Sequence, residues 1–400
     1  MAMNMRRRDF LKRTSAAAML ISPTAESLFA TTEKYELGEQ PSNPTGPETA
    51  KKVEDMHLSP SEAHKYLMSR MTPAMQYDGG DVREWQKKLR RKLRQLLGVM
   101  PESRCKLRPR RIWKRDHALG TIEKIVFTSE PCSDVPCYVC LPKNAAPPCT
   151  FMICLQGHNS GMHNSIAVQQ EDETKPLKIE GDRDFAIQCM SRGIAALCIE
   201  QRAFGERREL KQEHRFPQIC HDTAVHALML GRTLIGERVY DVDRGIDYLA
   251  SRGDANMKQI GIMGNSGGGQ TSIYSAAILS RISFAVPGCS FCQFPESIMS
   301  IRHCPCNYIP NMLTVADMPD ILGLFAPRPV VIVSGKNDPI FPIGAVCRGY
   351  RHLRKIYDAC GAKASCHHVV GDEGHRFYAD LAWPVIMKVI DELRKLSRGS

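Results

Sequence analysis

The sequence lacks internal repeats and low-complexity tracts over its 400 residues. Their absence excludes repeat architectures such as solenoids, and it excludes compositionally biased disordered or fibrous chains. Apolar residues make up 43% of the chain, which is enough to build a sizeable core. The length allows one large domain or two ordinary ones.

Acidic residues are fewer than basic ones, with 43 Asp and Glu against 54 Lys and Arg, and the formal net charge is +11. A dense basic stretch at residues 87–94 raises the question of a nucleic-acid partner. Trp85, Leu89 and Leu93, however, recur at the spacing of one apolar helix face, which puts the basic side chains on the opposite, solvated face. We therefore expect a surface helix here and no nucleic-acid partner.

The start of the chain carries an apolar run, residues 14–21, that is too short to cross a bilayer. Arg7 and Arg8 precede it within the segment Arg-Arg-Asp-Phe-Leu-Lys. This arrangement resembles the consensus of a twin-arginine (Tat) export signal. The resemblance implies a signal segment at residues 1–30, the Tat export machinery as a partner, and a periplasmic or extracellular location, with membrane anchoring if the signal stays uncleaved.

Residues 31–56 are polar and without periodicity, which is typical of a linker. Residues 57–400 are expected to form one domain that begins with a helical extension at 57–110. Strand-like runs follow, and then strands and helices alternate, which predicts a mostly parallel sheet with helices on both faces. The expected strands are residues 121–128, 135–141, 151–155, 194–200, 260–263, 284–286, 330–333 and 366–370, and the expected later helices are 224–250, 271–279, 346–360 and 378–396.

The sixteen cysteines allow more than one interpretation. Export would permit disulfides, and close pairs such as Cys132/Cys137, Cys289/Cys292 and Cys304/Cys306 are candidates whose connectivity the sequence leaves open. Cysteines inside apolar runs act as small hydrophobic residues. A zinc site built from Cys289-x-x-Cys292 and His303-Cys304-x-Cys306 is a less favoured alternative because the spacing is irregular. We expect no metal and no cofactor.

The clearest chemical motif is Gly264-Asn265-Ser266-Gly267-Gly268, which fits the G-x-S-x-G nucleophile elbow. This motif needs a strand before it and a helix after it, and the neighbouring sequence supplies both. A serine hydroxyl needs a base, and the base needs an orienting acid, in the chain order Ser, Asp, His. We therefore interpret Ser266 as a nucleophile rather than as part of a structural glycine-rich turn.

Asp338 and His375 each follow a late strand, at the sheet edge where ligands bind in open α/β folds. Asp317 and Asp320 precede the strand and so lie at its wrong end. His367 and His368 fall within a strand, and His303 has no acid in a suitable position. Asp338 and His375 are accordingly the expected acid and base of a triad with Ser266.

An oxyanion formed at Ser266 needs preorganised donors. The backbone N–H of Gly267 is one, and the loop after residues 151–155 should supply a second from the N–H of His158. His158 and His163 as metal ligands are a weaker alternative. Glu200 and Arg202 follow a strand end and are either pocket residues or a structural ion pair.

Further segments carry a family resemblance: residues 200–207, 231–233, 307–310, 320–321 and 326–330. Together with the elbow they are similar to the acetyl xylan esterase-like, dienelactone hydrolase-related branch of the α/β-hydrolases, over about residues 60–395. The resemblance implies an α/β-hydrolase fold, the triad Ser266, Asp338 and His375, and hydrolysis of an ester in a small-molecule or carbohydrate substrate, such as an acetylated polysaccharide.

Two departures limit the resemblance. Dienelactone hydrolases use a cysteine where this chain has Ser266, and glucuronoyl esterases carry an arginine where it has Gly267. A serine peptidase of the prolyl-oligopeptidase type is disfavoured because only some 90 residues stand between the signal and the core strands. A non-catalytic binding protein with this fold is the other alternative, and it gives no reason for an intact triad.

Overall fold

The computed structural model describes residues 57–98, 100–143, 145–209 and 220–398. The predicted signal segment and linker, residues 1–56, lie outside this range. The chain divides into two compact units, Met1–Leu67 and Met68–Ser400. Helix α3 (Pro60–Arg70) begins in the first unit, and all the strands belong to the second. Within the described part of the chain, no helix is long and apolar enough to span a membrane.

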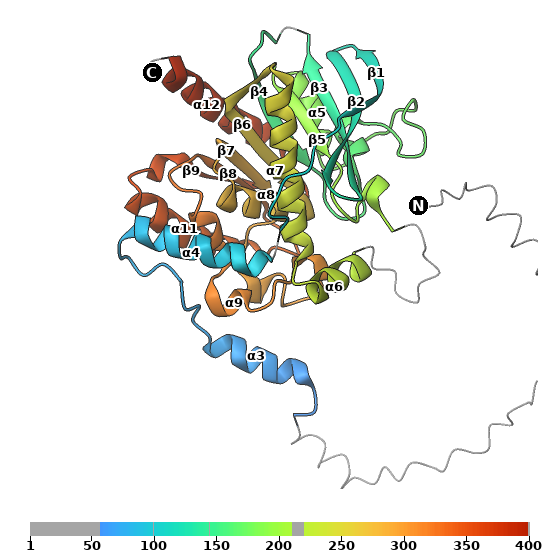
Figure 1. The fold of residues 1–400 in the computed structure, drawn as a ribbon. Coiled ribbons are helices and arrows are strands. Elements are labelled where there is room, and N and C mark those ends of the chain that lie inside the picture. The colour runs from blue at the N-terminus through green and yellow to red at the C-terminus, as the bar shows by residue number, and fades with distance from the viewer. Residues whose placement is uncertain (1–56, 99, 144, 210–219, 399–400) are drawn as a thin grey trace, which may run out of the picture. The chain divides into compact units, whose positions relative to one another are not determined.

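The second unit is built on one nine-stranded sheet in the order β1-β2-β3-β5-β4-β6-β7-β8-β9 (Figure 1). β1, β2, β3 and β5 pair antiparallel, and from β5 onward every pair is parallel. This arrangement confirms the predicted mostly parallel sheet. The strands are β1 (Arg110–His117), β2 (Gly120–Glu130), β3 (Ser133–Pro142), β4 (Cys149–Leu155), β5 (Ala195–Ile199), β6 (Ala255–Asn265), β7 (Phe284–Gly288), β8 (Val330–Gly335) and β9 (Cys366–Gly371).

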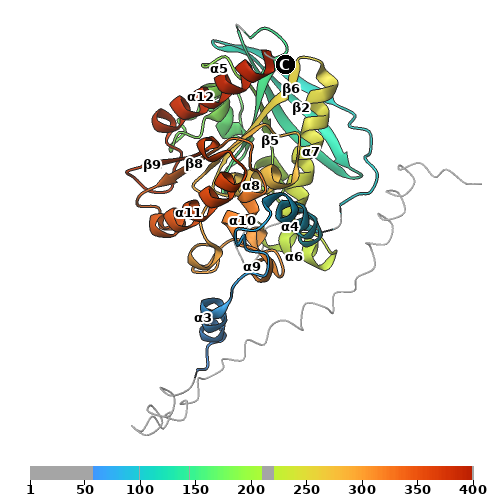
Figure 2. The same ribbon diagram turned by 90° about the vertical axis from the view of Figure 1, so that its left-hand side faces the viewer.

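Alternating side chains along the central strands divide the interior into two cores. In β4, Phe151, Ile153 and Leu155 face one core, whereas Met152 and Cys154 face the other. The first core is covered by α4 (Val82–Leu97), α7 (Leu234–Arg252), α8 (Gly267–Ile278), α10 (Met318–Gly323) and α11 (Ile343–Ala359). The second is covered by α5 (Phe185–Met190) and α12 (Ala379–Arg398), as the second view shows (Figure 2). Helices therefore cover both faces, as predicted.

Helix α4 contains the basic stretch and has the predicted two faces. Asp81 caps it by accepting hydrogen bonds from the amides of Arg83 and Glu84. Leu89 and Leu93 are fully buried, whereas most of the Lys and Arg side chains are exposed. Arg90 is an exception, because its guanidinium donates to two backbone carbonyls of the core helices. The helix is thus a packed surface element.

One predicted helix is wrong, and one strand was not predicted. The expected helix 224–250 is two helices, α6 (His221–Met229) and α7, because Gly231 adopts a left-handed backbone and Thr233 caps the new helix by accepting from the Gly236 amide. Strand β1 was not expected, because nearly all its side chains are exposed or half-buried and its sequence shows no apolar alternation.

A buried ion network joins the antiparallel strands to α7. The guanidinium of Arg202, just beyond β5, donates to Glu130 Oε1 (2.6 Å) and to Asp241 Oδ2 (2.9 Å). Arg207 also donates to Asp241 Oδ2 (2.6 Å). Burial opposes ionisation of Asp241, but the two arginines outweigh it and lower its pKa to about 2. The network holds the segment after β5 against α7.

Replacing Asp241 by Asn should destabilise the fold by roughly 3–5 kcal/mol, because the buried guanidinium of Arg207 loses its carboxylate partner and Arg202 keeps only Glu130 and Glu237. A depressed pKa means that the ionised carboxylate stabilises the protein above the ordinary value of 3.8, and that this contribution is lost as the pH falls toward 2. Urea unfolding at pH 7 and at several acidic pH values measures both effects. The acid-induced loss of stability should be shallower in Asp241→Asn than in the wild type.

The matched control is Asp134→Asn, which removes a half-exposed ion pair with Arg110 (2.8 Å). Its cost should stay below about 1 kcal/mol. Equal losses in the two variants would contradict the role assigned to the buried network.

Candidate active site

Ser266 occupies a sharp turn between β6 and α8, as the elbow motif predicts. Its backbone is strained, with φ +55° and ψ −120°, a region that residues with a Cβ rarely adopt. The Ser266 amide donates to the carbonyl of Gly288 at the end of β7 (2.9 Å), which ties the turn to the neighbouring strand. A methyl group at Gly268 would lie 2.2 Å from the Leu155 carbonyl oxygen, so only glycine fits there.

Asp338 and His375 meet across two loops at the carboxyl end of the sheet. Asp338, on the loop after β8, is 4% exposed, and its Oδ2 lies 2.8 Å from Nδ1 of His375. Its other oxygen, Oδ1, accepts from the amides of Ile340 (2.9 Å) and Phe341 (3.2 Å). Because a carboxylate only accepts hydrogen bonds, Nδ1 of His375 carries the hydrogen and Nε2 is left with its lone pair.

The His375 loop is held from two sides. The ring of Phe341 stacks on the imidazole, with centroids 5.9 Å apart and planes inclined by 16°. The Tyr378 hydroxyl donates to the carbonyl of Gly374, the residue just before the histidine (2.7 Å). These contacts orient the imidazole in addition to its hydrogen bond with Asp338.

A cavity of about 420 Å³ opens beside these residues. Ser266 and His375 both contribute to its wall, so the structure brings the predicted nucleophile and base to one pocket. The remaining lining residues are Gly157, His158, Asn159, Arg183, Asn265, Ile301, Arg302, His303, Cys304 and Ile340.

The two predicted oxyanion donors belong to segments that lie beside Ser266. Gly267 is the first residue of α8, and a first-turn amide has no acceptor within its own helix. The loop after β4 passes directly beside the serine, because a methyl group at Gly157 would lie 3.1 Å from Cβ of Ser266. His158 follows in this loop and lines the cavity. The predicted pair, Gly267 and His158, therefore lies on the two segments that flank Ser266.

The Asp and His residues that the sequence disfavoured as triad members form hydrogen bonds elsewhere in the structure. Asp317 caps α10 and accepts from the Phe294 amide (2.8 Å), and Asp320 accepts from the Tyr77 amide (3.0 Å). Asp320 also lies 2.7 Å from Nε2 of His352, a His–Asp pair that sequence reasoning missed and that has no place in the cavity wall. The ring of His368 lies 3.2 Å from the Ser334 hydroxyl.

Glu200 and Arg202 do not form the ion pair considered from the sequence. Arg202 belongs to the network with Asp241, whereas the Glu200 carboxylate accepts from the amides of Met162 and Glu206 (3.2 Å each). Burial raises the pKa of Glu200 to about 7. Neither side chain lines the cavity.

Cys289, considered from the sequence only for a disulfide or a zinc site, is a neighbour of the catalytic pair. Its thiol lies within 4.8 Å of the carboxylate of Asp338 and of the His375 ring, and it donates to the carbonyl of Arg376 (3.0 Å). Burial, together with the charge of Asp338, raises its pKa, so the thiol stays protonated. The residue packs beneath the histidine loop and is a poor nucleophile.

The sixteen cysteines are all described, and in this structure none forms a disulfide. The zinc grouping considered from the sequence is wrong in composition. Cys304 and Cys306 do not join Cys289, Cys292 and His303 but lie beside Cys220 and His158. The alternative metal pair His158 and His163 is also wrong, because His163 does not belong to the group of potential ligands around His158. Sequence reasoning missed Cys220, whose neighbours are far from it in the chain.

The comparison with protein families decides the classification, because a family model described as "Abhydrolase family" matches residues 49–355. The chain belongs to this family. Its sheet order and the turn at Ser266 agree with the α/β-hydrolase fold predicted from the sequence. A Bacillus subtilis (strain 168) member of the curated proteins, YtaP, described as a hydrolase, is 27% identical over 297 residues, which cover 72% of this chain and 93% of YtaP.

Solved structures share the fold at low sequence identity. A Bacteroides fragilis protein described as an acetyl xylan esterase superposes with a TM-score of 0.64 at 18% identity, over 82% of this chain and 85% of its own. A glucuronoyl esterase from Solibacter usitatus superposes with a TM-score of 0.59 at 16% identity, over 81% and 97% of the two chains. At these identities the similarity establishes the fold of this Abhydrolase-family chain and leaves its substrate open.

Replacing Gly267 by Ala should disturb the site without removing Ser266. A methyl group there would lie 2.8 Å from Cε1 and Nδ1 of the His158 ring, so the ring and its loop must shift. A displacement of about 1 Å in a catalytic loop can lower a rate by about 100-fold. We expect labelling of Ser266 by a fluorophosphonate probe to slow by at least about tenfold.

Gly344→Ala is the matched control, because its nearest contact would be the end of Arg348 at 3.7 Å. Its labelling rate should equal that of the wild type. Unchanged labelling of Gly267→Ala would show that the position of the His158 loop is unimportant for the reactivity of Ser266.

Proposed function

We propose that this protein is an exported serine esterase that hydrolyses carboxylic esters through an acyl-enzyme. The observation that carries the proposal is that Ser266, on its strained turn, and His375, paired with Asp338, line the same cavity. Family membership and the ester hydrolases among the structural neighbours support the same class of reaction.

In the proposed mechanism, Nε2 of His375 removes the hydroxyl proton of Ser266, and the alkoxide attacks the ester carbonyl. Asp338 holds the imidazole in the required tautomer and stabilises its positive charge. The amides of Gly267 and His158 stabilise the oxyanion. His375 then gives its proton to the departing alcohol, and a water activated by the same histidine hydrolyses the acyl-enzyme.

The Gly267 position supports a short acyl group over a uronic acid ester. In the sequence resemblance, glucuronoyl esterases carry an arginine after the serine. Here even a methyl group would lie 2.8 Å from the His158 ring, so an arginine would require the ring and its loop to move. The cavity volume, about 420 Å³, fits a small ester and leaves a carbohydrate alcohol to extend toward solvent. Acetyl esters of polysaccharides, the substrate named for one neighbour, are the class that we propose.

Two other functions receive less support. The structural neighbours named above are ester hydrolases, and none of them supports a peptidase of the prolyl-oligopeptidase type. A binding protein without activity has no need for a strained serine or for an ordered His–Asp pair.

The export part of the proposal rests on Arg7 and Arg8 before the short apolar run. Fractionation of the native host that left the protein in the cytoplasm would contradict it.

The esterase is tested by release of p-nitrophenol from acetyl, butyryl and octanoyl esters, with wild type and Ser266→Ala compared. We expect the acetyl ester to be turned over fastest and the variant to lose several orders of magnitude in kcat, because removal of a triad serine abolishes the covalent route. Ser272→Ala, which alters a buried serine on the same helix, is the control and should retain activity.

Failure of the wild type on all three esters, together with no fluorophosphonate labelling of Ser266, would favour the binding-protein alternative. Preference for the octanoyl ester would retain the mechanism and reject the short-acyl substrate class.

A further inference from the structure

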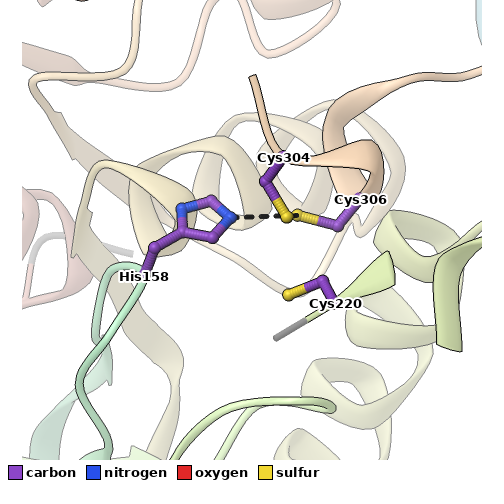
Figure 3. Close-up of side chains that lie close together, drawn as sticks. All are labelled: His158, Cys220, Cys304 and Cys306. Atoms are coloured by element: carbon purple, nitrogen blue, oxygen red, sulfur yellow. Dashed lines mark hydrogen bonds between the residues drawn. The ribbon is translucent and has the colours of Figure 1, made fainter. Parts of the chain in front are cut away.

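Four potential metal ligands converge beside the cavity from three separate segments. His158 comes from the loop after β4, Cys220 from the N-terminal end of α6, and Cys304 and Cys306 from the segment around the short helix at Pro305–Asn307. Their Nε2 and Sγ atoms all lie within 4.8 Å of one another. Figure 3 shows the four side chains pointing toward a common centre.

The distances between the potential ligand atoms approach those of a tetrahedral zinc site. Nε2 of His158 lies 3.1 Å from Sγ of Cys306, which lies 3.3 Å from Sγ of Cys304. Zinc bonds of about 2.3 Å to sulfur and about 2.0 Å to nitrogen place neighbouring ligands about 3.5–3.8 Å apart. Three thiolates and one imidazole form a usual donor set for structural zinc. We propose that His158, Cys220, Cys304 and Cys306 bind one Zn²⁺ ion.

A buried cation beside the cluster supports this assignment independently. Arg238 is 1% exposed, and one of its terminal nitrogens donates toward Sγ of Cys220 (3.4 Å). Its Nη1 is buried without a hydrogen-bond partner, and among the described residues no carboxylate pairs with it. A buried guanidinium needs a counter-charge. Zinc bound by three thiolates and a neutral imidazole carries a net charge of −1, which would provide it.

A neutral donor also lies beside the cluster, next to Cys306. The Asn307 side-chain amide donates toward Sγ of Cys306 (3.6 Å), as groups around a metal ligand commonly do.

The ion would be structural, because all four positions are filled by protein. Its effect would be to fix His158, whose backbone amide is the proposed oxyanion donor, and Cys304, which lines the cavity. The zinc site would therefore act as a positioning element for the loops around Ser266. The site itself does not depend on ester hydrolysis.

The test begins with the full chain, purified without a histidine tag from cells grown with zinc. Inductively coupled plasma mass spectrometry should find about one zinc per chain. Single replacements of Cys220, Cys304 or Cys306 by Ser should each reduce the zinc content at least about tenfold. Cys292→Ser, which alters a buried cysteine outside the cluster, should keep one equivalent.

A spectroscopic measurement keeps the test valid if the serine variants do not fold. Wild-type protein grown with cobalt in place of zinc should show the intense visible d–d bands of tetrahedral Co²⁺ and thiolate-to-cobalt charge transfer in the near ultraviolet. Octahedral bands without charge transfer would contradict ligation by these cysteines.

The proposal is overturned if folded wild-type protein contains no zinc and takes up no cobalt under reducing conditions. It is also overturned if peptide mapping of the exported protein finds a disulfide among Cys220, Cys304 and Cys306, because a bridge removes two of the four ligands. The metal content and the disulfide map are both measured without an activity assay. An inactive protein that contains one zinc would therefore reject the esterase and retain the metal site.

Discussion

The geometry of the site depends on how closely the Ser266 turn approaches the neighbouring strand. The serine takes a positive φ because β6 must change into α8 within one residue, and Gly268 must lie against the carbonyl of Leu155 at the end of β4. This strain is offset by the surrounding core, in which β4 and the second half of β6 are buried. The turn therefore places the Ser266 hydroxyl at the carboxyl edge of the sheet, where the loops after β4, β8 and β9 begin.

The loops around this turn are fixed by different kinds of interaction. Asp338 uses one carboxylate oxygen for two backbone amides and the other for His375, so its position is set by its own loop before the histidine binds. The segment after β5 is held by the ion network of Arg202 and Asp241. In our account, the loop after β4 is held by a metal ion through His158. Rigid surroundings of this kind keep catalytic groups in a reactive geometry.

Much of the fold could be predicted from the sequence because its signals are local. Short apolar runs indicated eight of the nine strands, and the elbow motif identified Ser266 from five consecutive residues. Asp338 and His375 could be selected because parallel strands end at one edge, which brings together residues that are far apart in the chain. β1 was missed because an exposed edge strand shows no apolar pattern, and the break before α7 was missed because it depends on Gly231 and the Thr233 cap.

The cysteine cluster could not be predicted in the same way. Cys304 and Cys306 entered only a less favoured zinc alternative, whose other ligands were sought nearby in the chain, whereas Cys220 and His158 come from distant segments. Cys220 has no local signal, because it starts a helix that was expected to be part of a longer one. Its place in the cluster appears only when the loops pack together around Arg238, which donates toward the Cys220 sulfur and whose Nη1 is buried without a hydrogen-bond partner.

The most direct test of the account is to trap the covalent intermediate. Wild-type protein would be mixed with p-nitrophenyl butyrate, quenched in acid within milliseconds, digested and mapped by mass spectrometry. The account predicts a butyryl group on Ser266 that disappears as turnover ends. A butyryl group on Cys289, the thiol nearest to the His375–Asp338 pair, or turnover without any acylated residue, would contradict the assignment of Ser266 as the nucleophile.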